Sequence, residues 1–232
     1  LLDRIDVELV RRHPKPLIGY SDITALHALW DREGLLALHA PMPASDLVRP
    51  GREADAQAVF GWLRQGLDAG TVLSWGPAPS APTATSESGD WPGGSVRGRL
   101  VGGNLSLIAS LCGTPWQLRT TGRILFLEDV SESLYRVDRL LLQLRLAGLL
   151  DAAAGFLIGS FTEDDDPLPV LREALVPLGK PMIVGWSSGH GTPNRPLPLG
   201  AMVHLDADRG CVTIEQPVLV PPALLQPPAR QV

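Results

Sequence analysis

The sequence predicts an α/β protein with parallel pairing of its strands. Short apolar runs that suit buried strands alternate with segments whose apolar residues recur at helical spacing, a pattern typical of parallel sheets covered by helices. A stretch rich in proline, serine and glycine at 77–94 interrupts this alternation and predicts a linker. The 232 residues, 44% of them apolar, suffice for a stable core without disulfides or a metal ion.

The first part of the chain, 1–76, reads as a helix followed by two strand–helix pairs. Pro14 and Pro16 end the first helix, and Gly34 stands where the next one should stop. Ser21 and Asp22 are residues typical of a helix N-terminus. The expected elements are a helix at 1–12, a strand at 15–20, a helix from 21 to 34, a strand at 35–39 and a helix at 54–70.

Beyond the linker the alternation begins again and continues to the proline-rich end. Asn104 can cap a helix, and residues 124–127 form a wholly apolar run that suits a buried strand. Strands are expected at 97–101, 123–127, 155–161, 182–185, 201–206 and 211–215, helices at 104–112 and 134–148, and a loose tail at 217–232.

Charge and composition exclude several classes of protein. The net charge is −5 and the basic residues do not cluster, so nucleic-acid binding is not expected. The longest apolar run, 152–159, is far too short to cross a bilayer. Cys112 and Cys211 are distant in sequence and predict buried free thiols of a reducing compartment. The histidine spacing fits no metal site, and neither a metal nor another cofactor is expected.

Ser21 is the first candidate for chemistry. It follows a predicted strand and begins a predicted helix, where free amide groups and the helix dipole suit a nucleophile that develops an oxyanion beside it. The alternative is that Ser21 or Asp22 only caps the helix. The GxSxG pattern of hydrolase elbows is not matched, because Ile23 replaces the second glycine.

Glu128 and His190 are the other two candidates. Glu128 ends the apolar run 124–127, so its carboxylate leaves a strand at the edge where open sheets bind ligands. An ion pair with an arginine is the alternative, and Asp129 and Glu132 compete for the same role. His190 lies between two glycines in a polar loop, where it can approach a partner closely and is a poor filler for a core.

Four segments taken together resemble the murein tetrapeptide LD-carboxypeptidases, serine peptidases related to the microcin C self-immunity proteins. They are KPLIGYSDITALHAL, LVGGNLSLIASLCGTPW, ILFLEDVSESLYRVDRLLLQLRLAG and SSGH…LPLGA, in the family's order over nearly the whole chain. The resemblance implies a Ser–His–Glu triad of Ser21, His190 and Glu128, rather than Glu132. It also implies that the Asp22 backbone N–H contributes to the oxyanion hole.

The same resemblance implies a two-domain fold. Residues 1–76 would be the remainder of an N-terminal parallel-sheet α/β domain that carries the nucleophile, and 95–232 a smaller β-rich C-terminal domain that carries the glutamate and the histidine, joined by 77–94. Relatives carry several dozen further residues before this point, ending in Arg-Gly-Gly-Tyr-Gly. We therefore expect the first strands and one oxyanion donor to be missing. His39-Ala40-Pro41-Met42 replaces the family's usual His-Gly-Pro-Met.

The function implied is a cytoplasmic LD-carboxypeptidase that removes the terminal D-Ala of murein tetrapeptides in peptidoglycan recycling. Its partner would be a muropeptide substrate, and a homodimer is one expected assembly. One alternative is a self-immunity peptidase that cleaves a microcin C-like aminoacyl-adenylate analogue, with Trp91 or Trp186 stacked on the adenine. A second alternative is an inactive peptide-binding fragment.

Overall fold

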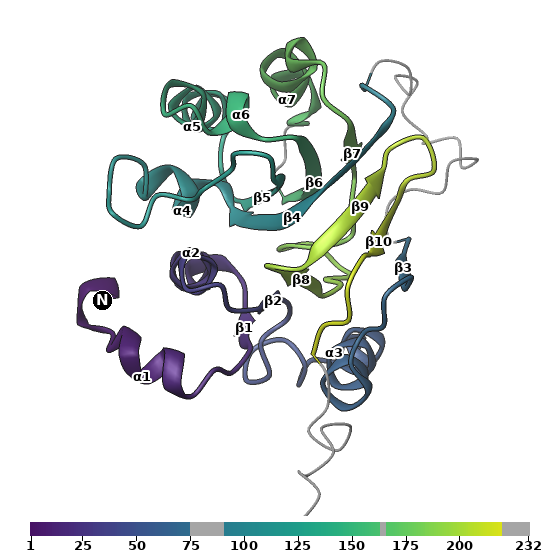
Figure 1. Ribbon diagram of the computed structural model, residues 1–232. Helices are drawn as coiled ribbons and strands as arrows, with labels where there is room; N and C mark the ends of the chain where they lie inside the picture. Colours follow the sequence, from purple (N-terminus) through teal and green to yellow (C-terminus); the bar gives the residue numbers. More distant parts are fainter. Residues whose placement is uncertain (75–90, 163–165, 220–232) are drawn as a thin grey trace, which may run out of the picture.

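The computed structural model describes residues 1–74, 91–162 and 166–219, and its strands form two sheets (Figure 1). In spatial order, the smaller sheet contains β1 (Leu17–Gly19), β2 (Ala37–His39) and β8 (Leu197–Leu199). The larger contains β3 (Val72–Leu73), β10 (Cys211–Ile214), β9 (Met202–Asp206), β4 (Ser95–Asn104), β5 (Ile124–Val130), β6 (Gly155–Thr162) and β7 (Met182–Val184).

Strand direction divides the larger sheet into two regions. The four strands from β4 to β7 are parallel, whereas β9, β10 and β3 add to the edge of β4 in antiparallel order. In the smaller sheet β1 and β2 pair in parallel and β8 pairs antiparallel to β2. The predicted class, an α/β fold with a parallel sheet and a β-rich region, is confirmed.

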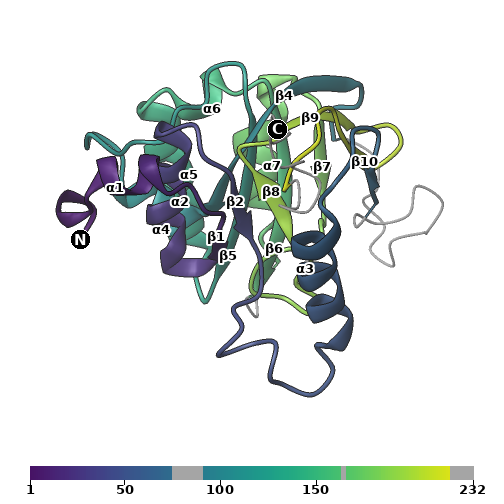
Figure 2. The ribbon, with the colours of Figure 1, turned by 60° about the horizontal axis from the view of Figure 1, so that its bottom comes forward.

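Helices cover the parallel strands on one side, and the smaller sheet lies on the other (Figure 1). The two helices nearest the N-terminus lie on one side of β1 and β2, and α3 lies on the other side (Figures 1 and 2). The α-helices are α1 (Val7–Arg12), α2 (Thr24–Arg32), α3 (Glu53–Gln65), α4 (Leu105–Ser110), α5 (Leu134–Leu146), α6 (Leu149–Ala152) and α7 (Leu168–Leu175). The 3-10 helices are η1 (Leu2–Arg4), η2 (Ser21–Ile23) and η3 (Val176–Leu178).

The side chains of β5 alternate between two hydrophobic cores, as the pleat of a strand requires. Leu125 and Leu127 pack with residues of α4, α5 and α7. Ile124 and Phe126 pack in the second core, with residues of β2, β8, β9 and α3. All four are fully buried, which confirms the prediction of a wholly apolar, buried strand.

Local signals in the sequence place the start of α4 correctly, whereas the helices expected at 1–12 and 54–70 are too long: the first is divided into η1 and α1. Asn104 caps α4, since its side chain accepts a hydrogen bond from the Leu107 N–H at 3.1 Å. The helix expected at 54–70 instead ends at Gln65, because Gly66 adopts a φ of +76° and Leu67 pairs with Val218 in a β-bridge.

Four elements of the two sheets and the α-helices were not expected from the sequence: β3, β8, α6 and α7. Strand β8 contains Pro198, which argues against a strand in a sequence but is tolerated here because β8 lies at the edge of the smaller sheet. Helix α7 begins after Pro167, in a segment next to an acidic loop.

The predicted linker and tail lie largely outside the described residues, at 77–90 and 220–232. The last four residues of the linker, 91–94, are tied to the large sheet: the Met182 N–H donates to Pro92 O at 3.1 Å, and the Gly94 N–H donates to Asp208 Oδ1 at 2.9 Å. The division into 1–76 and 95–232 stays a prediction. Strands cross it in both directions, since β8 joins the smaller sheet and β3 the larger one.

Two further expectations concern thiols and membranes. Cys211 is buried, Cys112 is half-buried, and both are free thiols. Across residues 1–74, 91–162 and 166–219, no helix has the length and apolar character needed to cross a bilayer.

Candidate active site

Ser21 lies at a sharp corner between β1 and η2. Its φ is +59°, in the left-handed region that non-glycine residues rarely adopt. A Cβ on Gly19 would lie 2.8 Å from Cγ1 of Ile23, so any larger residue at 19 would force the Ile23 side chain or the turn to move. A serine held in a strained strand-to-helix turn is the arrangement that lifts a nucleophilic hydroxyl out of regular structure.

The capping alternative for this corner is wrong. The N-cap positions of η2 and α2 are occupied by Tyr20 and Ile23, so Ser21 and Asp22 do not serve as caps. The first hydrogen bond of η2 runs from the Ile23 N–H to Tyr20 O at 3.1 Å. The preceding amide, that of Asp22, therefore has no partner within this helix and is available to an oxyanion.

Glu128 and His190 form a buried hydrogen-bonded pair. The Nδ1 atom of His190 lies 2.7 Å from Oε2 of Glu128, and the His190 backbone N–H donates to the same oxygen at 3.2 Å. Glu128 is 0% exposed, and the side chain of His190 is 14% exposed. The carboxylate of Glu128 is thus shielded from solvent, whereas the imidazole of His190 remains partly accessible.

The two groups shift each other's proton affinity. Burial raises the pKa of Glu128, but the interactions with His190 and then with His39 outweigh burial and lower this pKa to about 2. Burial lowers the pKa of His190, but the hydrogen bond and charge of Glu128 outweigh it and raise that pKa above its ordinary value. Glu128 is therefore ionised at neutral pH and stabilises a protonated His190.

The competing carboxylates are engaged elsewhere. Asp129 accepts hydrogen bonds from Asn104 Nδ2 at 2.7 Å and from Ser106 Oγ at 2.8 Å. Glu132 forms an ion pair with Arg136 at 2.7 Å. The side chains that the structure places beside the Glu128 carboxylate are those of His39 and His190, not the arginine of the alternative interpretation.

The glycines beside His190 permit its close approach to Glu128. A Cβ on Gly189 would lie 2.7 Å from Glu128 Oε2 and 2.6 Å from Ser160 Oγ. The Gly191 N–H donates to Ser160 Oγ at 3.0 Å. The prediction that glycine neighbours let this histidine reach a partner is confirmed.

Two residues at the start of α3 hold the same loop in place. Asp55, which is buried, accepts a hydrogen bond from the Asn194 N–H at 3.1 Å and pairs with Arg52 at 3.2 Å. Arg52 also donates to Gly191 O at 3.3 Å. The loop that carries His190 is therefore fixed by residues 139 positions earlier in the chain.

Tyr20 brings the serine corner and the histidine together. Its ring packs edge-on against His190, with centroids 4.8 Å apart, and it directly precedes Ser21. Its hydroxyl donates to Asp46 Oδ1 at 3.1 Å, and burial followed by Asp46 raises the pKa of Tyr20 to about 12. The Tyr20 hydroxyl is therefore uncharged at neutral pH, and its ring packs against His190 in the site.

Three residues of this site were missed by sequence reasoning: Tyr20, Asp46 and His39. The position of Tyr20 next to Ser21 was the available signal for the first. For His39 the signals were its place at the end of the strand that follows the corner and its place in the segment that corresponds to the family's His-Gly-Pro-Met. Asp46 lies in a turn region that carries no pattern.

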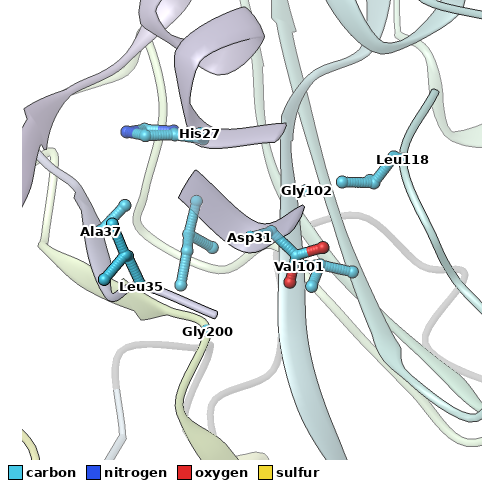
Figure 3. A pocket seen from close by; sticks show the side chains of 9 residues that line it. His27, Asp31, Leu35, Ala37, Val101, Gly102, Leu118 and Gly200 are labelled. Atoms are coloured by element: carbon cyan, nitrogen blue, oxygen red, sulfur yellow. The ribbon is translucent and has the colours of Figure 1, made fainter. Parts of the chain in front are cut away.

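The structure also contains a cavity of about 10 Å³ lined by His27, Asp31 and seven other residues (Figure 3). Ser21, Glu128 and His190 do not line it, so it is not the place where these three could act together. In the described part of the chain, no group of three or more histidine, cysteine or acidic side chains could hold a metal ion.

An α/β fold with a serine corner beside a buried carboxylate–histidine pair is typical of the serine hydrolases. Comparison with known proteins gives the family. Residues 1–40 match the LD-carboxypeptidase N-terminal domain, and residues 97–205 match the LD-carboxypeptidase C-terminal domain. The chain belongs to the LD-carboxypeptidase family, as its resemblance to those enzymes implied.

Individual relatives agree with this family. A putative carboxypeptidase of Streptomyces coelicolor is 36% identical over 96% of this chain and 69% of its own length. The probable murein peptide carboxypeptidase of Bacillus subtilis is 34% identical over 91% of this chain and 66% of its own. The chain therefore spans about two thirds of the length of these curated relatives.

Solved structures show the same fold. The muramoyltetrapeptide carboxypeptidase of Oxalobacter formigenes is similar with a TM-score of 0.79 and 28% identity, over 95% of this chain and 74% of that one. A microcin C7 self-immunity protein is similar with a TM-score of 0.77 and 25% identity, over 93% of this chain and 72% of that one.

Proposed function

We propose that this protein is a serine LD-carboxypeptidase that hydrolyses the bond between an L-configured centre and the terminal D-Ala of murein tetrapeptides, in the cytoplasm during peptidoglycan recycling. The observation that carries the proposal is the 2.7 Å hydrogen bond between His190 and the buried Glu128, beside the strained corner of Ser21. The named activities of the relatives, murein peptide and muramoyltetrapeptide carboxypeptidases, supply the substrate class.

The three side chains have separate roles in this reaction. The Nδ1 atom of His190 is bonded to Glu128, which leaves Nε2 to take the proton of the Ser21 hydroxyl. Glu128 holds the imidazole in this tautomer and stabilises the imidazolium that forms. Ser21 Oγ attacks the carbonyl carbon, and the Asp22 N–H donates to the resulting oxyanion.

The tetrahedral intermediate then gives an acyl-enzyme, which is hydrolysed in a second step. His190 returns its proton to the leaving nitrogen, so that the C–N bond breaks and D-Ala departs with a free amino group. A water molecule gives a proton to His190 and attacks the acyl-enzyme, which releases the shortened peptide and restores the Ser21 hydroxyl. No step requires a metal ion.

The self-immunity alternative finds no support from the two tryptophans considered for adenine stacking. Trp186 is 1% exposed, so it offers no surface to a ligand. The guanidinium of Arg172 lies 4.9 Å from the centroid of the Trp91 ring and covers one of its faces. We therefore favour the tetrapeptide substrate over an aminoacyl-adenylate analogue.

The test is incubation of the chain with a muropeptide tetrapeptide, with free D-Ala detected by mass spectrometry. A tetrapeptide ending in L-Ala and an aminoacyl sulfamoyl adenosine serve as matched controls. Release of alanine from the D-terminated peptide alone is expected, with no effect of EDTA. Preferential cleavage of the adenosine analogue would favour the self-immunity activity, and activity lost in EDTA but restored by zinc would replace the triad by a metal mechanism.

A further inference from the structure

His39 lies at the end of β2, behind the serine corner. It pairs in register with Gly19 of β1, and the next residue, Ala40, donates its N–H to Gly19 O at 3.0 Å. The His39 side chain is 0% exposed. A fully buried imidazole at this position is held by the same strand pair that forms the corner of Ser21.

The ring of His39 faces the free oxygen of Glu128. Its Nε2 atom lies 3.6 Å from Glu128 Oε1, at the opposite end of the carboxylate from His190. Oε2 has two donors, both from His190, whereas Oε1 has no hydrogen-bond partner. Both ring nitrogens of His39 are likewise without a hydrogen bond.

An ionised carboxylate oxygen that is buried without a donor is unfavourable, because it has lost its hydration and gained no hydrogen bond in exchange. The separation of 3.6 Å is too long for a hydrogen bond, but a shift of less than about 1 Å brings the two atoms to the normal 2.7–3.2 Å. Packing leaves the ring facing this way: Phe126 contacts it edge-on with centroids 4.9 Å apart, and Tyr20 does so at 5.9 Å.

We propose that His39 is a positioning residue of the catalytic site: its Nε2–H donates to Oε1 of Glu128 and so keeps Oε2 directed at His190. The proposal rests on the function proposed above and adds a second histidine to the site. One carboxylate then serves two imidazoles, each through its own oxygen. Without His39, the carboxylate can rotate and His190 loses its fixed orientation toward Ser21.

His27 provides a matched control for His39. It is also a buried histidine, with a ring centroid 6.2 Å from that of His39 and no hydrogen bond at either nitrogen. It lines the cavity of about 10 Å³ (Figure 3), and the hydrogen bonds and ion pairs of Glu128 among the described residues are with His39 and His190, not with His27. Burial, and then the nearby His39, lower the pKa of His27 to about 3, so it is neutral at pH 7.

The experiment compares His39→Leu, His39→Gln and His27→Leu with the unaltered chain in the D-Ala release assay. His39→Leu should lower kcat roughly 100-fold with little change in KM, the loss expected when a reacting group is misplaced by about 1 Å. His39→Gln should recover at least about tenfold of this loss, because its amide nitrogen can occupy the place of Nε2 and donate to Oε1. His27→Leu should change kcat by less than about threefold, since it touches neither Glu128 nor His190.

A spectroscopic readout tests the same contact without turnover. The proton between His190 Nδ1 and Glu128 should give a far-downfield NMR signal, assigned by its loss in His190→Gln. This signal should broaden or vanish in His39→Leu and persist in His39→Gln and His27→Leu. If the unaltered chain releases no D-Ala, the proposed function fails while the NMR series still tests the role of His39.

An unchanged kcat and an unchanged signal in His39→Leu would overturn the proposal. Equal losses in His39→Leu and His27→Leu would also overturn it, because they would reflect packing alone. If thermal melting shows that His39→Leu does not fold, His39→Gln is compared with His39→Asn, whose shorter amide cannot reach Oε1. A Gln variant that is more active than the Asn variant supports the proposal, and equal rates contradict it.

Discussion

Gly189 lies so close to Glu128 that a Cβ on it would be 2.7 Å from the carboxylate oxygen that binds His190. This approach lets both the backbone N–H and the ring of His190 reach that one oxygen. The absence of a side chain at 189 is therefore part of the geometry of the candidate site.

The first prediction follows from this contact. Gly189→Ala should lower kcat by roughly 100-fold or more, because the new methyl group must displace either the carboxylate or the loop by about 1 Å. Gly179→Ala is the control: that glycine also has a positive φ, of +62°, but nothing lies within 4 Å of its added Cβ. Both variants should lose some stability, measured by urea unfolding, and only Gly189→Ala should lose activity. Similar kinetic losses in both would contradict the interpretation.

The second prediction separates the hydroxyl of Ser21 from its backbone. Ser21→Ala should lower kcat by several orders of magnitude, as in other serine triads. Ser21→Gly should be equally inactive but more stable than Ser21→Ala by up to about 1 kcal/mol, because glycine adopts the φ of +59° without strain. Kinetics and thermal unfolding measure the two effects. Retention of more than about a tenth of the activity by either variant would remove Ser21 from the mechanism.

The third prediction concerns the pH dependence of kcat/KM. His190 must be neutral to act as a base, and Glu128 raises its pKa above the ordinary value of about 6.5. Activity should therefore rise with pH through an apparent pKa above the ordinary value of about 6.5. Glu128→Gln removes the charge, so its lower activity should rise at a lower pH. A midpoint unmoved by this substitution would show that another group titrates.

The fourth prediction concerns stability in acid. The pKa of Glu128 is lowered to about 2 in the folded protein from 4.5, so its contribution is present above 4.5 and is lost as the pH falls through 2. The free energy of unfolding of the unaltered chain should fall relative to that of Glu128→Gln by about 3 kcal/mol between pH 5 and pH 2. Urea unfolding at a series of pH values measures this difference. A constant difference would mean that Glu128 is not held as an ion.

The raised pKa of His190 affects stability on the alkaline side, whereas that of Glu128 affects it in acid. Its contribution to stability is fully present below the unfolded pKa of about 6.5 and is lost as the pH rises through the higher folded value. Stability of the unaltered chain relative to His190→Gln should therefore decline on the alkaline side. The same unfolding series, extended to pH 9, checks this sign.

Features that depend on a few consecutive residues were predictable from the sequence. The apolar run before Glu128 predicted a buried strand, Asn104 predicted the start of α4, and the two glycines predicted an approachable His190. The corner at Ser21 was also indicated, because a strand signal meets a helix signal there. Each of these features depends on periodicity, capping or backbone freedom within a few residues.

Local patterns left Glu128, Asp129 and Glu132 in competition, the resemblance implied Glu128, and the tertiary structure shows which carboxylate meets the histidine. Glu128 and Asp129 are adjacent, but the pleat sends Glu128 toward His39 and His190 and sends Asp129 toward the N-terminus of α4. The order of the strands in space then determines what each carboxylate meets. The same spatial order places β8, which contains Pro198, at the edge of the smaller sheet. Contacts between residues far apart in the chain depend on how sheets and helices pack, and no local pattern encodes that packing.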